Sequence, residues 1–180
     1  MELLKGIKER RSIRKYKSDK VSKETIEKII DNARYAPSWK NSQTARYTII
    51  TDEKVKADIA ENATMNFSKN MNNINSAPVL VVLSTVDKIS GYNPDGTAAT
   101  SMGGHWQSFD AGIACEAFCL SAYEYGLGTL IMGIFNEDKV KEIADIPDSE
   151  RVSALIALGY PDESPRAPKR KEISEISKFI

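Results

Sequence analysis

The longest helical pattern in the sequence covers residues 105–125, and it constrains the fold more than any other segment. Most of its side chains are small, and its charged residues are Asp110, Glu116 and Glu124. A helix with so few charges is buried on most of its sides, and small side chains let neighbouring backbones approach closely. We therefore expect this helix to lie in the interior with other elements packed around it.

The remaining elements alternate irregularly along the chain. Strands are predicted at 46–51, 77–85, 129–133 and 151–160, and helices at 3–9, 54–63, 137–144 and from Ser22 to just before Pro37. A polar, asparagine-rich segment covers 66–75, a long loop covers 88–104, and the chain ends in a short amphipathic segment. This order favours an α+β fold with a mixed sheet over a repeating βαβ fold.

Length and composition exclude several classes of protein. A chain of 180 residues with 41% hydrophobic and 28% charged residues is typical of one folded domain, here residues 1–180. The 25 basic and 25 acidic residues balance, which argues against a protein that coats nucleic acid. No apolar run is long enough to span a membrane, and the N-terminus has no apolar signal core, so we expect a cytoplasmic protein.

Most protein-borne catalytic groups are missing. The single histidine, His105, has no evident acid partner, so a surface position is the preferred interpretation over a catalytic one. Cys115 and Cys119 share a helix face, and without further ligands they are interpreted as packing residues rather than a metal site. The sequence contains neither GxGxxG nor a P-loop. If the chain is an enzyme, a cofactor is expected to carry the reaction.

Two basic clusters stand out in a chain without net charge. RRSIRKY contains Arg10, Ser12 and Arg14, which point to one side if the backbone is extended. A second cluster, 166–171, lies near the C-terminus. Arginine forks match phosphate oxygens, so both clusters could bind one anion, although solvated charge runs are the commoner outcome. The loop PSWKNSQ adds amide and hydroxyl groups that can bind a heterocycle, or can simply form a capped turn.

Five stretches in order indicate a family. They are RRSIRKY, APSWKNSQ, SAPVLVVLS, DAGIACEAFCLSAYEYGLGTLIMGIF and ALGYPDESPRAPKRKEISEI. Together they resemble the nitroreductase family of FMN-dependent oxidoreductases over nearly the whole chain. The resemblance implies a mixed, mainly antiparallel sheet flanked by helices, and a homodimer with the flavin site at the subunit interface.

The resemblance also implies which residues contact FMN. The N-terminal arginines and Ser12 would hold the phosphate and ribityl chain, and Arg14 would support the negative charge of the reduced flavin. The loop 37–43 would reach the flavin partly from the second subunit, and the turn at Gly133 would border the ring. The full set of implied contacts is Arg10, Arg11, Ser12, Arg14, Pro37, Ser38, Trp39, Asn41, Gln43, Lys69, Asn72, Ile131, Met132, Gly133, Lys169 and Arg170.

This sequence departs from the family pattern at several positions. Thr44 stands where proline is common, and bulky Trp39 stands where small polar residues are common. Pro168 replaces a residue that is usually basic, so the distant half of the phosphate clamp is expected from Arg170, with or without Lys169. The loop 88–104 is the expected lid, and the predicted substrate contacts are Trp39, Tyr92 and Trp106.

The resemblance implies a ping-pong hydride transfer from NADH or NADPH, through flavin N5, to a nitroaromatic, a quinone or a similar electrophile. No side chain is assigned as a catalytic acid or base. Two alternatives remain open at this point. One is a flavin-binding sensor or store without turnover, and the other is an anion- or nucleic-acid-binding domain that uses the basic clusters.

Overall fold

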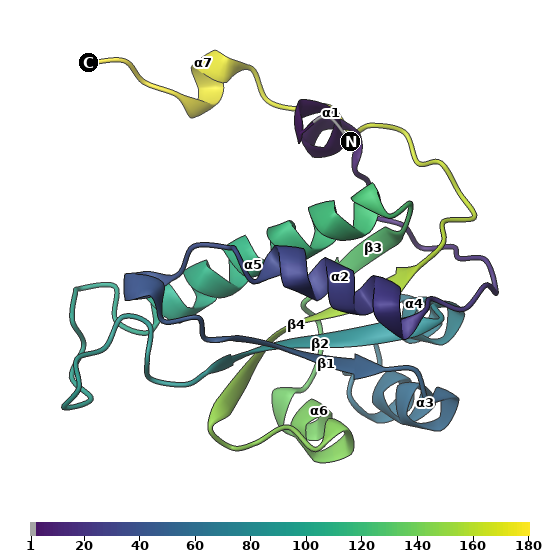
Figure 1. Ribbon diagram of the computed structural model, residues 1–180, viewed down its shortest axis with the longest axis horizontal. Helices are drawn as coiled ribbons and strands as arrows, with labels where there is room; N and C mark the ends of the chain where they lie inside the picture. Colours follow the sequence, from purple (N-terminus) through teal and green to yellow (C-terminus); the bar gives the residue numbers. More distant parts are fainter. Residues whose placement is uncertain (1–2) are drawn as a thin grey trace.

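The computed structural model describes residues 3–180 as an α+β fold in three layers (Figure 1). The elements in chain order are α1 (Leu3–Glu9), α2 (Lys23–Ala33), the 3-10 turn η1 (Trp39–Asn41), β1 (Ala45–Ile50), α3 (Glu53–Asn62), α4 (Ser68–Ser76), β2 (Val79–Val86), α5 (His105–Glu124), β3 (Gly128–Met132), α6 (Glu137–Ala144), β4 (Glu150–Gly159) and α7 (Ile173–Ile176). Within these residues four strands form one sheet in the order β1-β2-β4-β3, with every neighbouring pair antiparallel. The predicted α+β class and mainly antiparallel sheet are confirmed.

The central strands β2 and β4 separate two hydrophobic cores. Side chains alternate along β2, so Leu80 and Val82 face α3, α4 and α6, whereas Val81 and Leu83 face α2 and α5. Phe118 of α5 is fully buried in the second core. The long small-residue helix therefore lies against the sheet, as expected from its sequence.

Most predicted elements are present with boundaries shifted by a residue or two. Ser22 caps α2, because its Oγ accepts the backbone N–H of Thr25 at 3.1 Å. The main difference is α4, which forms in the segment predicted only to be polar. Its inner face carries Asn70 and Ile74 and follows helical spacing, so the tertiary context makes a helix of a sequence with few apolar residues.

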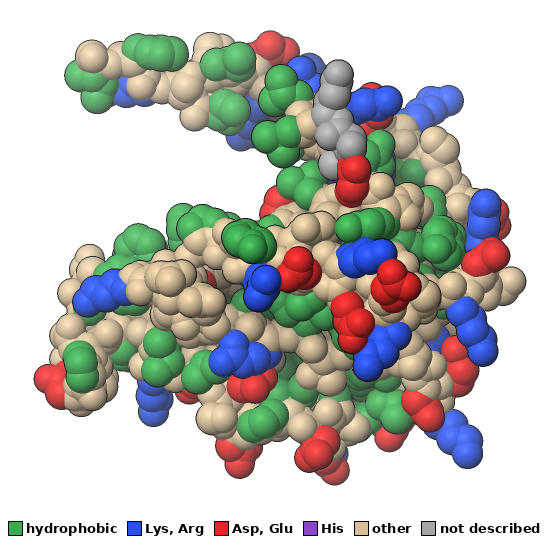
Figure 2. All heavy atoms as spheres, in the orientation of Figure 1, with side chains coloured by type: hydrophobic (Ala, Val, Ile, Leu, Met, Phe, Trp, Pro, Cys, Tyr) green, Lys and Arg blue, Asp and Glu red, His purple; other side chains and the backbone are tan. Residues whose placement is uncertain are grey.

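The chain after β4 leaves the body of the protein. Residues 163–180 run past α1 and end in α7, and Figure 1 shows this tail projecting from the layers. Figure 2 shows open space between the tail and the surface below it. The apolar side chains of Ile173, Ile176, Phe179 and Ile180 are exposed. Within residues 3–180, none of the helices combines the length and apolar character that crossing a bilayer requires.

Candidate functional site

The N-terminal arginine–serine segment is held against the outer edge of β3. Ser12 forms a parallel bridge with Thr129, and the N–H of Ile13 donates to the Thr129 carbonyl at 3.0 Å. Gly128 makes this approach possible, because a Cβ there would lie 2.5 Å from Cγ1 of Ile13. The extended backbone predicted for this segment is thus present, with Ile13 buried and Arg14 on the exposed side.

The same segment continues along the chain that follows β4. The N–H of Lys17 donates to the Tyr160 carbonyl, and the N–H of Asp162 donates to the Lys15 carbonyl, both at 2.9 Å. The Tyr16 hydroxyl donates to the Ile13 carbonyl at 2.6 Å, and burial raises the pKa of this phenol. Residues 12–17 are therefore held by β3 on one side and by residues 160–162 on the other.

Each arginine of this segment has a different environment. Arg10 Nε lies 3.7 Å from a carboxylate oxygen of Glu116 on α5. Arg11 donates to the Lys8 carbonyl at 2.7 Å and to the Arg10 carbonyl at 2.8 Å, so its guanidinium is engaged by the local backbone. Arg14 donates to the Ser12 carbonyl at 3.3 Å. Arg10 consequently extends toward α5, while Arg14 folds back over the segment itself.

A cavity of about 550 Å³ opens between α5 and the edge of the sheet that carries β3 and β4. Its lining includes Gly112, Cys115 and Glu116 of α5, Ile131 of β3 and Tyr92 of the long loop. Glu116, the partner of Arg10, stands on this wall, so the arginine lies at the rim. Three features therefore lie close together at this cavity: the cation of Arg10, the small side chains of α5 and the exposed apolar side chain of Ile131.

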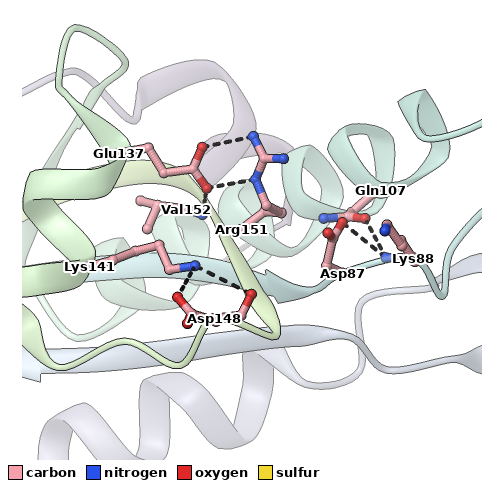
Figure 3. A network of polar contacts seen from close by, with 8 residues as sticks. All are labelled: Asp87, Lys88, Gln107, Glu137, Lys141, Asp148, Arg151 and Val152. Atoms are coloured by element: carbon pink, nitrogen blue, oxygen red, sulfur yellow. Dashed lines mark hydrogen bonds and ion pairs between the residues drawn. The ribbon is translucent and has the colours of Figure 1, made fainter.

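The opposite rim carries a network of charged and amide groups (Figure 3). Arg151 Nε and Nη2 donate to the two carboxylate oxygens of Glu137 at 2.7 and 2.9 Å. Although partial burial of Glu137 opposes ionisation, the hydrogen bonds from Arg151 and from the N–H of Val152 lower the pKa of this carboxyl. Arg151 and Val152 of this network line the cavity. The two hydrogen bonds to Glu137 hold the guanidinium of Arg151 in one orientation.

The turn after β3 is fixed by α4. The side-chain amide of Asn70 donates to the Ile134 carbonyl at 3.0 Å, and Asn70 is almost fully buried. Lys69 and Asn72, the residues of this segment that are predicted to contact the flavin, are both exposed on α4, and their role stays a prediction. The helical spacing of Asn70 and Ile74 would have identified the inner face. Gly133 lies at the start of this turn, with no other atom within 4 Å of the position that a Cβ would take.

The loop 37–43 has an unusual backbone. Lys40, Asn41 and Gln43 all have positive φ, at 48°, 55° and 50°. Non-glycine residues rarely adopt this conformation, and such strain often accumulates at binding sites. The Ser38 hydroxyl oxygen accepts the N–H of Gln43 at 2.9 Å, which closes the loop on itself. The residues predicted to approach a flavin therefore lie in a tight turn of defined shape.

Asp110 of α5 anchors this loop, a role that sequence reasoning missed. Its Oδ2 accepts the N–H of Trp39 at 2.9 Å and the hydroxyl of Ser90 at 2.6 Å. The Ser90 hydroxyl also contacts those of Ser42 and Thr44 at 3.1 and 3.4 Å. Thr44, which stands at a position where proline is common in the family, thus joins a polar network. A lone aspartate in a nearly uncharged, buried helix was the available signal.

The predicted lid, 88–104, is partly ordered by its own contacts. Gly91, with φ of 87°, lies so close to Gly103 that a Cβ would meet the Gly103 carbonyl oxygen at 2.2 Å. Trp106 Nε1 donates to the Thr100 hydroxyl at 2.9 Å. Of the predicted substrate contacts, Trp39 and Trp106 lie together, with ring centroids 4.9 Å apart, whereas Tyr92 faces the cavity beside α5.

The second basic cluster is not joined to the first within the described protomer. Arg170 donates to the Pro168 carbonyl at 3.3 Å and is exposed on the tail, as is Lys169. No hydrogen bond or ion pair links either residue to the segment 10–14 among residues 3–180. The predicted phosphate clamp between Arg10 and Arg170 stays a prediction.

The remaining candidate groups have structural roles. Cys115 and Cys119 are buried free thiols, and their mutual hydrogen bond together with burial raises the pKa of Cys115. Within residues 3–180 no group of three His, Cys, Asp or Glu side chains is arranged to hold a metal ion. A larger cavity, about 850 Å³, lies between α2, β1 and the end of α4, and it contains none of the predicted site residues.

Comparisons with known proteins place this geometry in a family. The sequence profile described as "Nitroreductase family" matches residues 7–160. An Archaeoglobus fulgidus protein named NADH dehydrogenase/NAD(P)H nitroreductase is 31% identical over 166 residues, which are 90% of this chain and 87% of the relative. An iodotyrosine deiodinase from Nematostella vectensis is 24% identical over 97% of this chain and 74% of its own length.

Solved structures agree with the profile. A nitroreductase family protein from Clostridium novyi NT superposes with a TM-score of 0.77 and 34% identity, covering 92% of this chain and 88% of that protein. A protein from Exiguobacterium sibiricum, solved in complex with FMN, has the same fold, with a TM-score of 0.85 at 21% identity over 100% and 98% of the two chains. With the profile matched over most of its length, the chain belongs to the nitroreductase family.

Proposed function

We propose that this protein is an NAD(P)H-dependent FMN oxidoreductase that reduces nitroaromatics, quinones or similar electrophiles in two separate stages. Family membership and the relatives named NAD(P)H nitroreductase support the enzyme class. The observation that carries the proposal is the attachment of the arginine–serine segment to β3, since Ser12 bridges Thr129 while Arg10 reaches Glu116. This arrangement brings the guanidinium of Arg10 to Glu116, which lines the cavity together with apolar Ile131.

The residues around this cavity fit FMN, which combines a flat ring with a phosphate dianion. Arg10 and Ser12 offer guanidinium and hydroxyl donors for the phosphate, and the Nη groups of Arg10 make no hydrogen bond to residues 3–180. Ile131, with 44% of its surface exposed, offers an apolar face for the ring. The turn at Gly133 has space for a close approach of the ligand to the backbone.

Bound FMN would supply hydride transfer at its N5 atom. Arg14 would stabilise the negative charge that the pyrimidine edge gains on reduction, because a fixed cation lowers the energy of a nearby anion. Asn70 would keep the turn at Gly133 in place by holding the Ile134 carbonyl. No described side chain is needed as an acid or base, and solvent can supply the proton.

We further propose a homodimer that completes the site. Several apolar side chains are exposed: Leu3, Leu4 and Ile7 of α1, and Ile173, Ile176, Phe179 and Ile180 of the tail. Exposed apolar side chains that gather into a patch are typical of protein interfaces. The strained loop 37–43 and Arg170 would then reach the flavin of the partner, which accounts for the separation of the two basic clusters.

The decisive experiment is the absorption spectrum of the purified protein, recorded before and after anaerobic addition of NADH or NADPH. The proposal predicts a yellow protein that either nucleotide bleaches and that an acceptor such as a quinone reoxidises. Steady-state kinetics should then give parallel lines for the two substrates. A yellow protein that neither nucleotide bleaches would instead indicate a flavin sensor or store, and a colourless protein with salt-dependent nucleic-acid binding would overturn the assignment.

A further inference from the structure

The 3-10 turn η1 and the N-terminal end of α5 bring three aromatic rings together. Trp39 of the strained loop lies 4.9 Å from Trp106, and Trp106 lies 5.4 Å from Phe109 in an edge-to-face contact, both measured between ring centroids. Phe109 is 54% exposed. We call Trp39, Trp106 and Phe109 the aromatic cluster. It is an apolar, polarisable surface that a planar ring can contact.

The aromatic cluster is positioned by hydrogen bonds rather than by burial. The backbone of Trp39 is tied to Asp110 at 2.9 Å, and the indole N–H of Trp106 is tied to Thr100 at 2.9 Å. One ring is therefore fixed to α5 through its main chain and the other to the lid through its side chain. Preorganised rings lose little conformational freedom when they bind a ligand.

A cation stands over this cluster. The ammonium of Lys40 lies 5.5 Å from the centroid of the Trp39 ring, and the positive φ of Lys40 fixes the direction in which its side chain leaves the loop. Among residues 3–180, Lys40 makes no ion pair. Arg46, which follows the same loop, donates to the carbonyls of Gln43 and Ala45 and also has no carboxylate partner in this part of the chain.

Among residues 3–180, the aspartate that anchors this loop forms no ion pair with Lys40. Asp110 is buried, and its Oδ2 accepts two hydrogen bonds, from Trp39 and from Ser90. Other lysines of the fold do pair, as Lys28 does with Glu24 at 2.7 Å and Lys139 with Glu142 at 2.7 Å. The positive charge beside the aromatic cluster is therefore available to a ligand.

We infer that the enzyme prefers planar aromatic acceptors that carry an anionic substituent, and that Lys40 determines this specificity. The inference rests on the proposed function. The ring of the acceptor would stack on the aromatic cluster, and its carboxylate or phenolate would meet the ammonium of Lys40. For a nitroarene the reaction adds a hydride and one solvent proton, breaks one N–O bond, releases water and leaves the nitroso product, while NAD(P)H becomes NAD(P)⁺.

The test compares para-nitrobenzoate with para-nitrobenzamide, which have nearly the same shape but differ in charge. The ratio of their kcat/KM values should exceed one in the unaltered enzyme and fall about three- to fivefold in Lys40→Gln, because a partly exposed ion pair contributes roughly 1 kcal/mol or less. Lys40→Glu should reverse the preference. Lys54→Gln, an exposed lysine on the opposite face of the sheet, is the matched control and should leave the ratio unchanged.

A second readout does not depend on turnover. The chain has two tryptophans, Trp39 and Trp106, and both belong to the aromatic cluster, so quenching of their fluorescence reports binding there. Para-nitrobenzoate should quench at lower concentration than the amide, and added salt should remove that difference. If the enzyme is bleached by NADH and reduces both compounds equally, only the specificity assignment is wrong. If no nucleotide bleaches it, the proposed function fails first.

Discussion

The carboxylate of Asp110 and the main chain of Trp39 form the link that ties the strained loop 37–43 to the long helix α5. The bond is 2.9 Å long, and Asp110 is 4% exposed. Asp110 also accepts the hydroxyl of Ser90, which contacts the hydroxyl of Ser42 in the same loop, so the loop is tied to this carboxylate at two places. A residue that looked like an ordinary helix charge in the sequence thus positions part of the candidate site.

Replacing Asp110 with alanine should therefore weaken both stability and the order of the loop. The substitution leaves the half-buried N–H of Trp39 and the buried hydroxyl of Ser90 without their acceptor, which costs about 1–3 kcal/mol of unfolding free energy. Asp110→Asn retains one carbonyl oxygen and should cost less. Denaturant unfolding gives the free energies, and the tryptophan emission spectrum reports the loop. Equal stability of the two variants would contradict the role of Asp110 as an acceptor.

Gly128 should tolerate no side chain. A Cβ at this position would lie 2.5 Å from Cγ1 and 2.8 Å from Cβ of Ile13, so Gly128→Ala must displace the N-terminal segment from β3. We expect faster hydrogen exchange at the Ile13 amide, which donates to Thr129, and a lower affinity for FMN. If the Ile13 amide exchanges as slowly in the alanine variant as in the unaltered protein, the N-terminal segment has shifted together with β3 and has not separated from it.

Arg10 should distinguish FMN from riboflavin. If its guanidinium binds the phosphate, Arg10→Gln should lower FMN affinity about tenfold or more, because hydrogen bonds to charged groups contribute roughly 1.5–3 kcal/mol. Riboflavin, which lacks the phosphate, should bind the variant and the unaltered protein alike. Arg34→Gln is a suitable control, because Arg34 pairs with Asp31 on α2 away from this segment. Equal losses for both flavins would argue against a phosphate contact.

Acid should weaken the network at the rim of the cavity. Partial burial raises the pKa of Glu137, but hydrogen bonds from Arg151 and Val152 outweigh it and hold this pKa below the ordinary value of 4.5 for a glutamate. A carboxyl with a lowered folded-state pKa stabilises the fold above about that value, and the contribution is lost as the pH falls through the folded-state pKa. Glu137→Gln should thus cost about 1 kcal/mol or less at neutral pH and nothing in strong acid. Glu24→Gln, in an exposed pair with Lys28, should change stability less than Glu137→Gln does at neutral pH.

The sequence predicted the layers of the fold because their signals are local. The apolar run that became β2 and the small side chains of α5 require burial whatever surrounds them. The helix α4 was missed because its segment has only a few apolar side chains, among them Met71 and Ile74, and its stability comes from packing against the sheet.

The candidate site could be predicted only in part, because some of its contacts join residues that are far apart in the sequence. Charge and spacing within one segment drew attention to Arg10 and Ser12, and the resemblance assigned them to FMN, which stays a prediction. Asp110 and Asn70 act on residues far away in sequence, at Trp39 and Ile134, and no local pattern identifies such partners. The proposed clamp between Arg170 and Arg10 stays a prediction, because within residues 3–180 no hydrogen bond or ion pair joins the two residues.

Removing the tail should test the proposed dimer. Residues 172–180 carry four exposed apolar side chains, and within the described chain they make no contact with either hydrophobic core. A chain that ends at Lys171 keeps Arg170 and should fold normally, because both cores are intact. Its dimer should nevertheless dissociate at a higher protein concentration, which sedimentation at several concentrations would measure. If the truncated chain dimerises as tightly as the full one, the tail has no part in the interface, and Ile7→Glu on α1 should then separate the subunits.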